Sequence, residues 1–175
     1  MKSHKKITIA AALAGLFVLP SAAMAGTITV GTVTGAPGAN VVVPVTLAGD
    51  GIVVDFQTDF DFTGLTFVSG NSPVGGNCFQ RAAPNDTKAR TLAPANPTST
   101  PVTATPTVYC EFTLGIPAAT ADGTVIPLPV TLSECFDNLG NIQPCAGTND
   151  GSVTVSVGPP PDVIVTFTPA SGGTV

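Results

Sequence analysis

Apolar and polar residues alternate in a series of short runs along most of this chain. The residues that share one side of each run are Ile28 and Val30; Val41, Val43, Val45 and Leu47; Phe56, Phe60 and Phe62; Leu65 and Phe67; Val108, Cys110, Phe112 and Leu114; Ile126, Leu128, Val130 and Leu132; and Val153, Val155 and Val157. A period of two residues is typical of a β-strand with one buried face. Glycine and proline separate the runs, as turns require. The pattern predicts an all-β fold, a two-sheet sandwich or jelly roll.

The third run suggests a candidate binding surface. Its three phenylalanines point to one side, and Asp55, Gln57, Asp59 and Asp61 point to the other. Strand alternation makes the two sets mutually exclusive. We therefore expect the phenylalanines in the core and Asp55, Gln57 and Asp59 on a solvated face that contacts a partner. Tyr109 is expected on the outer side of its strand, where it is a further candidate contact.

Residues 1–25 have the features of a secretory signal peptide. Lys2, Lys5 and Lys6 precede an apolar stretch from Ile7 to Leu19, and Ala23-Met24-Ala25 is a small-x-small cleavage site. We expect cleavage before Gly26 and a protein that is secreted, periplasmic or displayed on the cell surface. An uncleaved membrane anchor is the alternative, although the apolar stretch is shorter than a span of about 20 residues.

Removal of this segment makes the chain strongly acidic. The remaining chain has three basic and 11 acidic residues, which gives a net charge of −8. Such a charge opposes binding to nucleic acid and to anionic lipid, so we expect neither partner and no membrane insertion after cleavage. Residues 26–158 are long enough for one domain with its own core.

Four cysteines, Cys78, Cys110, Cys135 and Cys145, form an even set in a chain bound for an oxidising compartment. Of the three possible pairings we favour Cys78–Cys110 and Cys135–Cys145, because the second pair flanks the turn-rich segment FDNLGNIQP. Each disulfide should stabilise the fold by roughly 3 to 4 kcal/mol in the chain-entropy model. A zinc site is disfavoured, since there is no C-x-x-C pair and the single histidine, His4, lies in the signal segment.

Two segments interrupt the strand pattern. Thr91 to Thr107 is rich in threonine and proline and is expected to be a long surface loop, or an O-glycosylated one. Residues 159–161 are prolines that form a stiff linker, and residues 162–175, DVIVTFTPASGGTV, resemble the first strand of a further unit. The chain is therefore expected to be part of a longer protein.

Several motifs resemble those of the cohesin family. The turn Thr34-Gly35-Ala36-Pro37-Gly38-Ala39 precedes the strand Val41-Val42-Val43-Pro44-Val45-Thr46. Gly51-Ile52, Asp55-Phe56, Phe60-Asp61 and Leu65 follow in the family's order, and Asp150 to Val155 resembles its closing strand. The resemblance covers most of residues 26–158. The segment from Asn71 to Thr107 does not match, and cohesins generally lack its cysteines.

The resemblance implies a cohesin-like jelly-roll sandwich of about nine strands. It also implies a non-catalytic role, because cohesins hold a calcium-dependent dockerin module through one sheet face. Asp55 falls where the family has an aspartate in that face. Val53 falls where the better-known members have an asparagine.

Catalytic and metal sites find less support in the residues. Asp59 to Gly64 resembles the start of a calcium loop, but its twelfth position is Gly70, which has no carboxylate. Asp59 and Asp61 have the spacing of a glycosidase carboxylate pair, roughly 6.6 Å apart on one strand face. The chain after Ala25 contains no histidine for a nucleophile–base pair. We therefore expect no enzyme activity and no cofactor.

The function expected from the sequence is a non-enzymatic interaction module that binds another protein, of the dockerin type or on a surface. Carbohydrate binding is the first alternative. The chain has no tryptophan and one tyrosine, so it offers little aromatic surface for stacking on a polysaccharide, but a polar cleft for a short glycan stays open. A purely structural spacer domain is the second alternative.

Overall fold

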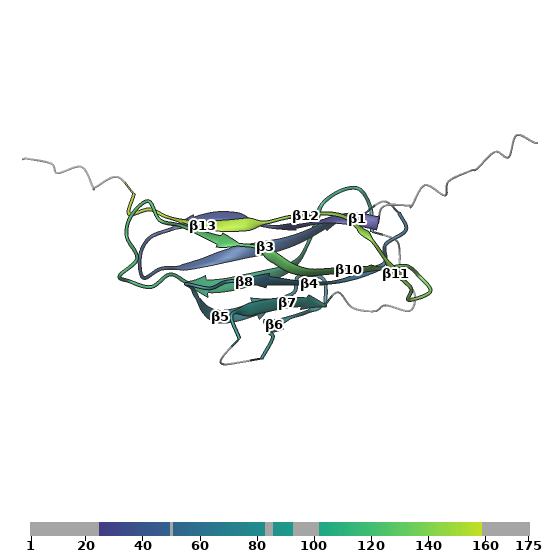
Figure 1. The fold of residues 1–175 in the computed structure, drawn as a ribbon, viewed down its shortest axis with the longest axis horizontal. Coiled ribbons are helices and arrows are strands. Elements are labelled where there is room, and N and C mark those ends of the chain that lie inside the picture. The colour runs from purple at the N-terminus through teal and green to yellow at the C-terminus, as the bar shows by residue number, and fades with distance from the viewer. Residues whose placement is uncertain (1–24, 50, 83–85, 93–101, 159–175) are drawn as a thin grey trace, which may run out of the picture.

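Two five-stranded sheets stack face to face in the computed structural model (Figure 1). The model describes residues 25–49, 51–82, 86–92 and 102–158, and contains no helix among them. The first sheet has the order β12-β1-β3-β8-β5, and the second has the order β11-β10-β4-β7-β6. A small third sheet, β2-β13-β9, closes one end of the sandwich. The predicted all-β two-sheet fold is confirmed.

The strand boundaries are as follows. The first sheet contains β1 (Ala25–Val30), β3 (Asn40–Ala48), β5 (Thr66–Asn71), β8 (Thr107–Gly115) and β12 (Cys145–Asn149). The second contains β4 (Asp55–Asp61), β6 (Asn77–Gln80), β7 (Lys88–Leu92), β10 (Val130–Phe136) and β11 (Ile142–Gln143). The small sheet contains β2 (Thr32–Gly35), β9 (Val125–Leu128) and β13 (Gly151–Val155).

The described residues form 13 strands rather than about nine, because three long strands are each interrupted by one residue. Gly31 separates β1 from β2, Pro129 separates β9 from β10, and Asp150 separates β12 from β13. At each break the chain passes between a large sheet and the small one. Two of these breaks are in close contact: a Cβ atom on Gly151 would lie 2.3 Å from the carbonyl oxygen of Gly31. Only glycine fits at this crossing.

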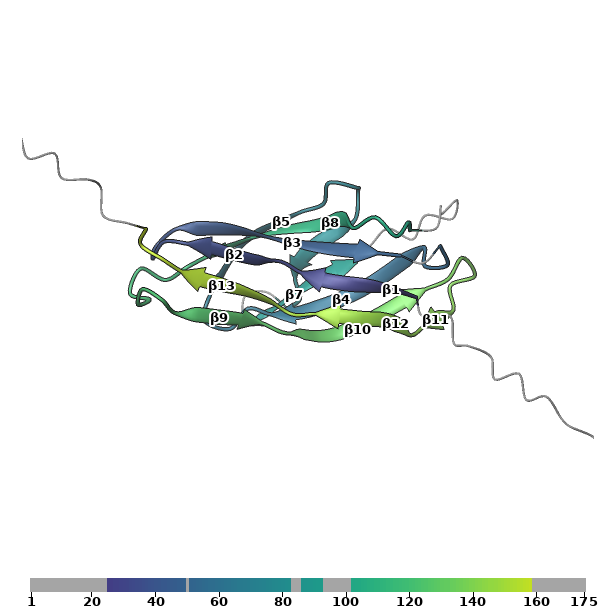
Figure 2. The same cartoon turned by 90° about the horizontal axis from the view of Figure 1, so that it is seen from above.

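The first and last strands of the fold run in the same direction. β1 pairs with β12, and β2 pairs with β13, in parallel register, whereas the other strand pairs are antiparallel. As a result β1 begins at one end of the sandwich and β13 ends at the other (Figure 2).

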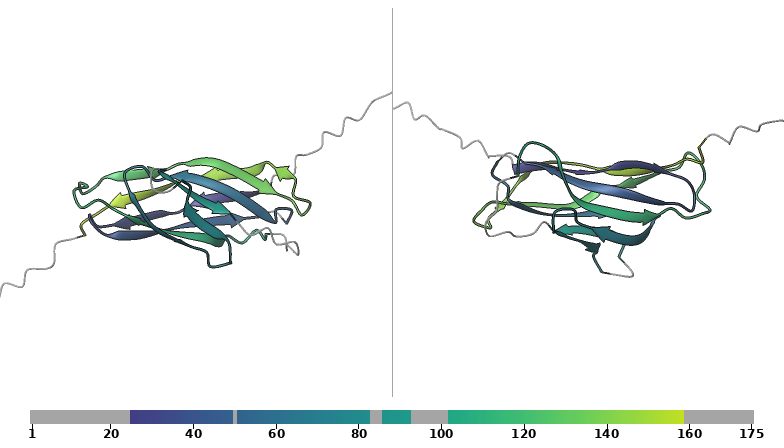
Figure 3. Two further views of the ribbon diagram at one scale, coloured as in Figure 1. Left: turned by 90° about the horizontal axis from the view of Figure 1, so that it is seen from below. Right: turned by 180° about the vertical axis from the view of Figure 1, so that it is seen from behind.

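The core lies between the two large sheets, which are seen from below and from behind in Figure 3. As predicted, Phe56, Phe60 and Phe62 point inward and are buried. Phe60 meets Phe112 of the first sheet edge to face, with ring centroids 5.2 Å apart. This geometry is favoured for aromatic pairs beyond the area that they bury.

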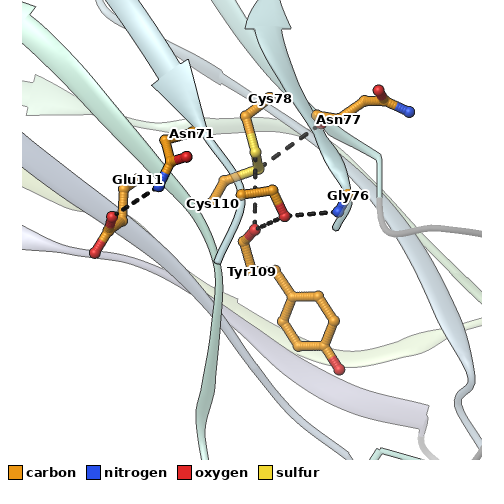
Figure 4. The surroundings of a disulfide bond; sticks show 8 residues. Asn71, Gly76, Asn77, Cys78, Tyr109, Cys110 and Glu111 are labelled. Atoms are coloured by element: carbon orange, nitrogen blue, oxygen red, sulfur yellow. Dashed lines mark hydrogen bonds between the residues drawn. A yellow bond between two sulfur atoms is a disulfide. The ribbon is translucent and has the colours of Figure 1, made fainter. Parts of the chain in front are cut away.

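Both favoured disulfides are present, and each joins one large sheet to the other. Cys78 of β6 bonds to Cys110 of β8, and Cys135 of β10 bonds to Cys145 of β12. The described chain has no free cysteine. Figure 4 shows the first bond, beside the backbone carbonyl of Tyr109 and the Asn71–Glu111 hydrogen bond. The two bonds hold the sheets together on opposite sides of the sandwich.

Two β-bulges correct the predicted alternation. The pairing of β3 with β8 shifts by one residue at Tyr109, because Val45 faces Cys110 but Thr46 faces Val108. Tyr109 therefore turns toward the core, where its ring lies edge-on to Phe56 at 5.1 Å, and it is not the outward contact that the sequence predicted. The pairing of β10 with β4 shifts at Thr131, and Leu132 consequently lies on the outer side of its sheet. A bulge adds one residue to one strand, so residues on the two sides of the bulge no longer follow a single alternation.

The threonine- and proline-rich interruption between strands is shorter than the predicted Thr91 to Thr107. Thr91 and Leu92 belong to β7, Thr107 begins β8, and Val102 is buried in the core. The strands β6 and β7 are not predicted by the hydrophobic pattern. The expected signal segment up to residue 24, the proline linker and residues 162–175 lie outside the described residues. The described segments contain no helix that is long and apolar enough to cross a membrane.

Replacing Phe60 with alanine should lower the free energy of unfolding by about 3 to 5 kcal/mol, because it leaves a cavity between the sheets. Phe79, on β6, is 38% exposed and is the matched control. Phe79→Ala should cost less than about 1 kcal/mol. Urea unfolding of both variants measures the difference. Equal effects would show that the side of β4 that faces the core has been assigned wrongly.

Two buried threonines provide a second pair of variants that tests the core. The Thr58 hydroxyl donates a 2.8 Å hydrogen bond to the carbonyl of Leu132, whereas Oγ1 of Thr91 is buried without a partner in the described structure. Thr58→Val should therefore destabilise the fold by about 1 to 2 kcal/mol, and Thr91→Val should be neutral or stabilising by up to about 1 kcal/mol. Thermal unfolding of the two variants tests this, and a reversed order would contradict it.

Candidate functional site

The outer face of the second sheet is the candidate site. It is formed by the side chains of that sheet that point away from the core. These are Asp55, Gln57, Asp59 and Asp61 of β4, Leu132, Glu134 and Phe136 of β10, Lys88, Arg90 and Leu92 of β7, and Asn77 and Phe79 of β6. The acids of β4 thus lie in the middle of a wider surface that β7 and β10 complete.

Cross-strand register divides this outer face into an acidic end and a mixed end. Asp55 lies opposite Phe136, and the next row along brings Glu134 beside Gln57. At the far end of β4, Asp61 lies opposite Lys88. Arg81, Lys88 and Arg90 are the only basic residues of the chain after Lys6. All the positive charge of the fold is therefore found on or beside one hairpin, β6–β7.

Asp59 is buried, which corrects its predicted exposure. It does point away from the core, but its side chain is only 1% exposed because Arg90 covers it. Nε of Arg90 donates to Oδ1 of Asp59 at 2.7 Å, and Nη2 donates to Oδ2 at 2.8 Å. Such a two-pronged pair is shorter and stronger than a neutral hydrogen bond. It joins β4 to β7 and fixes the centre of the outer face.

The ion pair extends into a short network. Nη1 of Arg81 approaches Oδ2 of Asp59 at 3.4 Å, and Nε of Arg81 donates to Asp86 at 2.9 Å. The hydrogen bond to Asp59 raises the pKa of Arg90, and the hydrogen bond from Arg81 lowers the pKa of Asp86. Both oxygens of Asp59 are thus engaged, so Asp59 and Asp61 do not present a free pair of carboxylates.

Asp55 lies at the acidic end, within electrostatic reach of Tyr109 of the first sheet. Burial raises the pKa of the Asp55 carboxyl, against the hydrogen bond that its Oδ1 accepts from the backbone N–H of Phe56. Burial also raises the pKa of Tyr109, and the charge of Asp55 adds to that shift. Asp55 is therefore a partly desolvated carboxylate, which gains more from a partner's positive charge than a fully hydrated one would.

The calcium-like segment does not form a metal loop. Oδ1 of Asp61 accepts hydrogen bonds from the backbone N–H and the hydroxyl of Thr63, at 2.8 and 2.7 Å, and closes a turn. Burial opposes these bonds, but together with Thr87 and Lys88 they lower the pKa of Asp61. Within the described ranges no group of three or more His, Cys, Asp or Glu side chains is placed to hold a metal ion.

Apolar side chains border the buried ion pair. Leu132 lies opposite Asp59 on one side, and Phe79 lies beside Arg90 on the other. Leu92 occupies the neighbouring row between Gln57 and Asn77. Apolar side chains that are partly exposed thus lie on both sides of the buried ion pair.

A cleft of about 300 Å³ opens elsewhere, between β5 and the β6–β7 hairpin. Its apolar lining comes from Phe62, Leu65 and Phe67, and its polar lining from Thr66, Gln80, Asp86 and Thr87. It is at the lower limit of the volumes of small-molecule sites. This cleft contains the kind of polar groups that a short glycan requires.

Sequence reasoning found the acids of the outer face but missed their partners. It placed Asp55, Gln57 and Asp59 on one side of β4, which the structure confirms, but it did not identify Arg90, Leu132 or Phe79. The segment Lys88–Leu92 does alternate, with Ala89 and Thr91 buried. Its inward residues are small or polar, so the hydrophobic signal was too weak to mark a strand.

Solved structures similar to this fold are cohesins. The sixth cohesin of scaffoldin B from Acetivibrio cellulolyticus, solved in complex with a Cel5 dockerin mutant, is 23% identical and superposes with a TM-score of 0.61 over 76% of this chain and all of that chain. The seventh ScaB type I cohesin from Pseudobacteroides cellulosolvens is 16% identical, with a TM-score of 0.63 over 79% of this chain and 97% of its own.

A non-cellulosomal cohesin from the hyperthermophilic archaeon Archaeoglobus fulgidus is 13% identical, with a TM-score of 0.57 over 75% of this chain and 91% of its own. No protein-family model and no curated protein matches the sequence. The fold is therefore cohesin-like, as the sequence motifs suggested, at an identity that establishes the architecture alone.

Replacing Asp59 with asparagine should destabilise the protein by about 2 to 4 kcal/mol, since it leaves Arg90 without its charge partner; the cost stays below that of a fully buried pair because Arg90 is partly exposed. Asp61→Asn is the matched control and should stay within about 0.5 kcal/mol, because an amide oxygen can still accept from Thr63. Chemical denaturation measures both. A small effect of Asp59→Asn would mean that the ion pair is solvated.

Proposed function

We propose that this cohesin-like sandwich is a non-catalytic module that binds another protein through the outer face of the second sheet. The observation that carries the proposal is the arrangement of that face. A rigid central ion pair between Asp59 and Arg90 is bordered by Leu132, Leu92 and Phe79, with unequal charge at the two ends. Apolar anchors beside fixed polar groups favour a specific protein contact.

The fold supports a protein partner but does not identify it. Cohesin structures of the same architecture were solved in complex with dockerins. Val53, which falls where better-known cohesins have an asparagine, is completely buried here and cannot reach a partner. A dockerin-like partner of this protein would therefore depend on Gln57, Leu132 and Glu134 instead.

Export is the second part of the proposal. The signal-like segment, the acidic charge and two disulfides together favour a protein that acts outside the cytoplasm, where disulfides persist. Glycan binding is the second candidate function, and the cleft beside Phe67 supports it. Because Tyr109 turns toward the core, a glycan would have to use that cleft and not the outer face.

The test is capture of a partner from the host's secreted proteins with the disulfide-bonded protein as bait. Leu132→Arg, at the centre of the outer face, should abolish capture. Val42→Arg is the matched control: Val42 is exposed on the first sheet, so this variant should capture normally. Loss of capture with Val42→Arg and not with Leu132→Arg would place the interface on the first sheet and contradict the proposal. Loss of capture when a soluble glycan is added would favour the second candidate function.

Asp55→Ala should weaken binding of the captured protein by roughly tenfold, about 1.4 kcal/mol. It should leave the free energy of unfolding within about 0.5 kcal/mol, because Asp55 lies on the outer side of β4 and is not part of the buried core. Isothermal titration and thermal unfolding separate the two effects. If Asp55→Ala unfolds the domain, the assignment of the two sides of β4 is inverted.

A further inference from the structure

The hairpin that joins β10 to β11 is unusually well fixed for an exposed turn. The carboxylate of Asp137 accepts four hydrogen bonds: from the backbone N–H groups of Leu139 and Asn141, both at 2.9 Å, and from the side chains of Asn141 and Gln143, both at 3.0 Å. The Cys135–Cys145 disulfide closes its base. We call residues 135–145 the clipped hairpin.

The clipped hairpin exposes apolar side chains. Leu139 is 80% exposed and Ile142 is 65% exposed, the highest values of any large apolar residues in the described structure. Burying such a side chain on binding is worth about 1.5 to 3 kcal/mol. A mobile loop would lose part of that gain when it becomes ordered, whereas the four hydrogen bonds and the disulfide restrain the clipped hairpin before binding.

Strand register makes the clipped hairpin part of the outer face. Phe136 lies opposite Ile142 on one side and opposite Asp55 on the other. Directly opposite residues in a sheet point to the same side. Asp55, Phe136 and Ile142 therefore form one row across three strands, and Leu139 projects from the turn beyond it.

The charge around this row is negative. Asp55 and Glu134 lie beside Phe136, whereas Arg90 is paired with Asp59 at the centre of the outer face and Lys88 lies at the opposite end. Asp55 is partly buried, and this burial raises the pKa of its carboxyl. A partner's cation in this position would gain more than it would at a hydrated surface.

We propose that the clipped hairpin is an apolar anchor that inserts Leu139 into a groove of the protein partner, and that this partner carries Lys or Arg beside its groove, facing Asp55 and Glu134. This inference rests on the proposed function and specifies the chemistry of the partner. An anionic membrane does not fit the same site, because the acidic end repels it.

The test uses a phage-displayed library of random 16-residue peptides, panned against the disulfide-bonded protein. Enriched peptides should combine apolar residues with Lys or Arg, and their affinity, measured by fluorescence anisotropy, should fall as salt rises. Leu139→Ser should weaken binding at least tenfold. Val125→Ser, which changes an exposed valine at the other end of the domain, is the matched control and should have no effect.

A second variant tests the rigidity of the anchor. Asp137→Ala removes the four hydrogen bonds but keeps Leu139 and Ile142, so it should weaken the same peptides severalfold. Circular dichroism should show the fold of each variant unchanged.

The outcomes separate this inference from the proposed function. Peptides that lose binding with Leu132→Arg but keep it with Leu139→Ser would overturn the anchor and leave the outer face as the interface. Peptides indifferent to both variants would overturn both proposals. Enrichment of acidic peptides, or binding of Leu139 to anionic vesicles in place of peptides, would overturn the proposed partner chemistry.

Discussion

The two-residue alternation of β4 is the constraint on which the rest of this structure depends. It sends Phe56 and Phe60 between the sheets, where they meet Tyr109 and Phe112, and it sends Asp55, Gln57 and Asp59 outward. A shift of one residue would turn these three polar side chains into the apolar core and expose the two rings. The core and the candidate interface are therefore two consequences of a single register, which the Asp59–Arg90 pair and the two disulfides hold in place.

Much of the fold could be predicted from β3, β4 and β13, because most of their inward residues are large and apolar and recur at every second position. The disulfide pairing followed from the spacing of the cysteines. The errors at Tyr109 and Leu132 share one cause: each follows from a β-bulge, and a bulge depends on the pairing of two strands that are distant in sequence. The burial of Asp59 was missed for the same reason, since Arg90 is 31 residues away and becomes its neighbour only through cross-strand register.

Cross-strand pairing also explains why the outer face of the second sheet is not uniformly polar and charged. Covering Asp59 with Arg90 removes one acid from the solvent and leaves Leu132 and Phe79 beside a neutralised centre. The negative charge then remains at one end, with Asp55 and Glu134, next to the apolar side chains of the clipped hairpin. The two ends of the outer face therefore differ in charge, so charge as well as shape can orient a partner on it.

Carboxyl footprinting by carbodiimide labelling and mass spectrometry tests the central claim most directly, because it examines both sides of β4 at once. In the free protein, Asp55 and Glu134 should label and Asp59 should not, because its side chain is 1% exposed. When the captured partner is bound, Asp55 and Glu134 should become protected, while Glu111 on the first sheet should label as before. Labelling of Asp59 in the free protein, or protection of Glu111 and not of Asp55, would contradict the account.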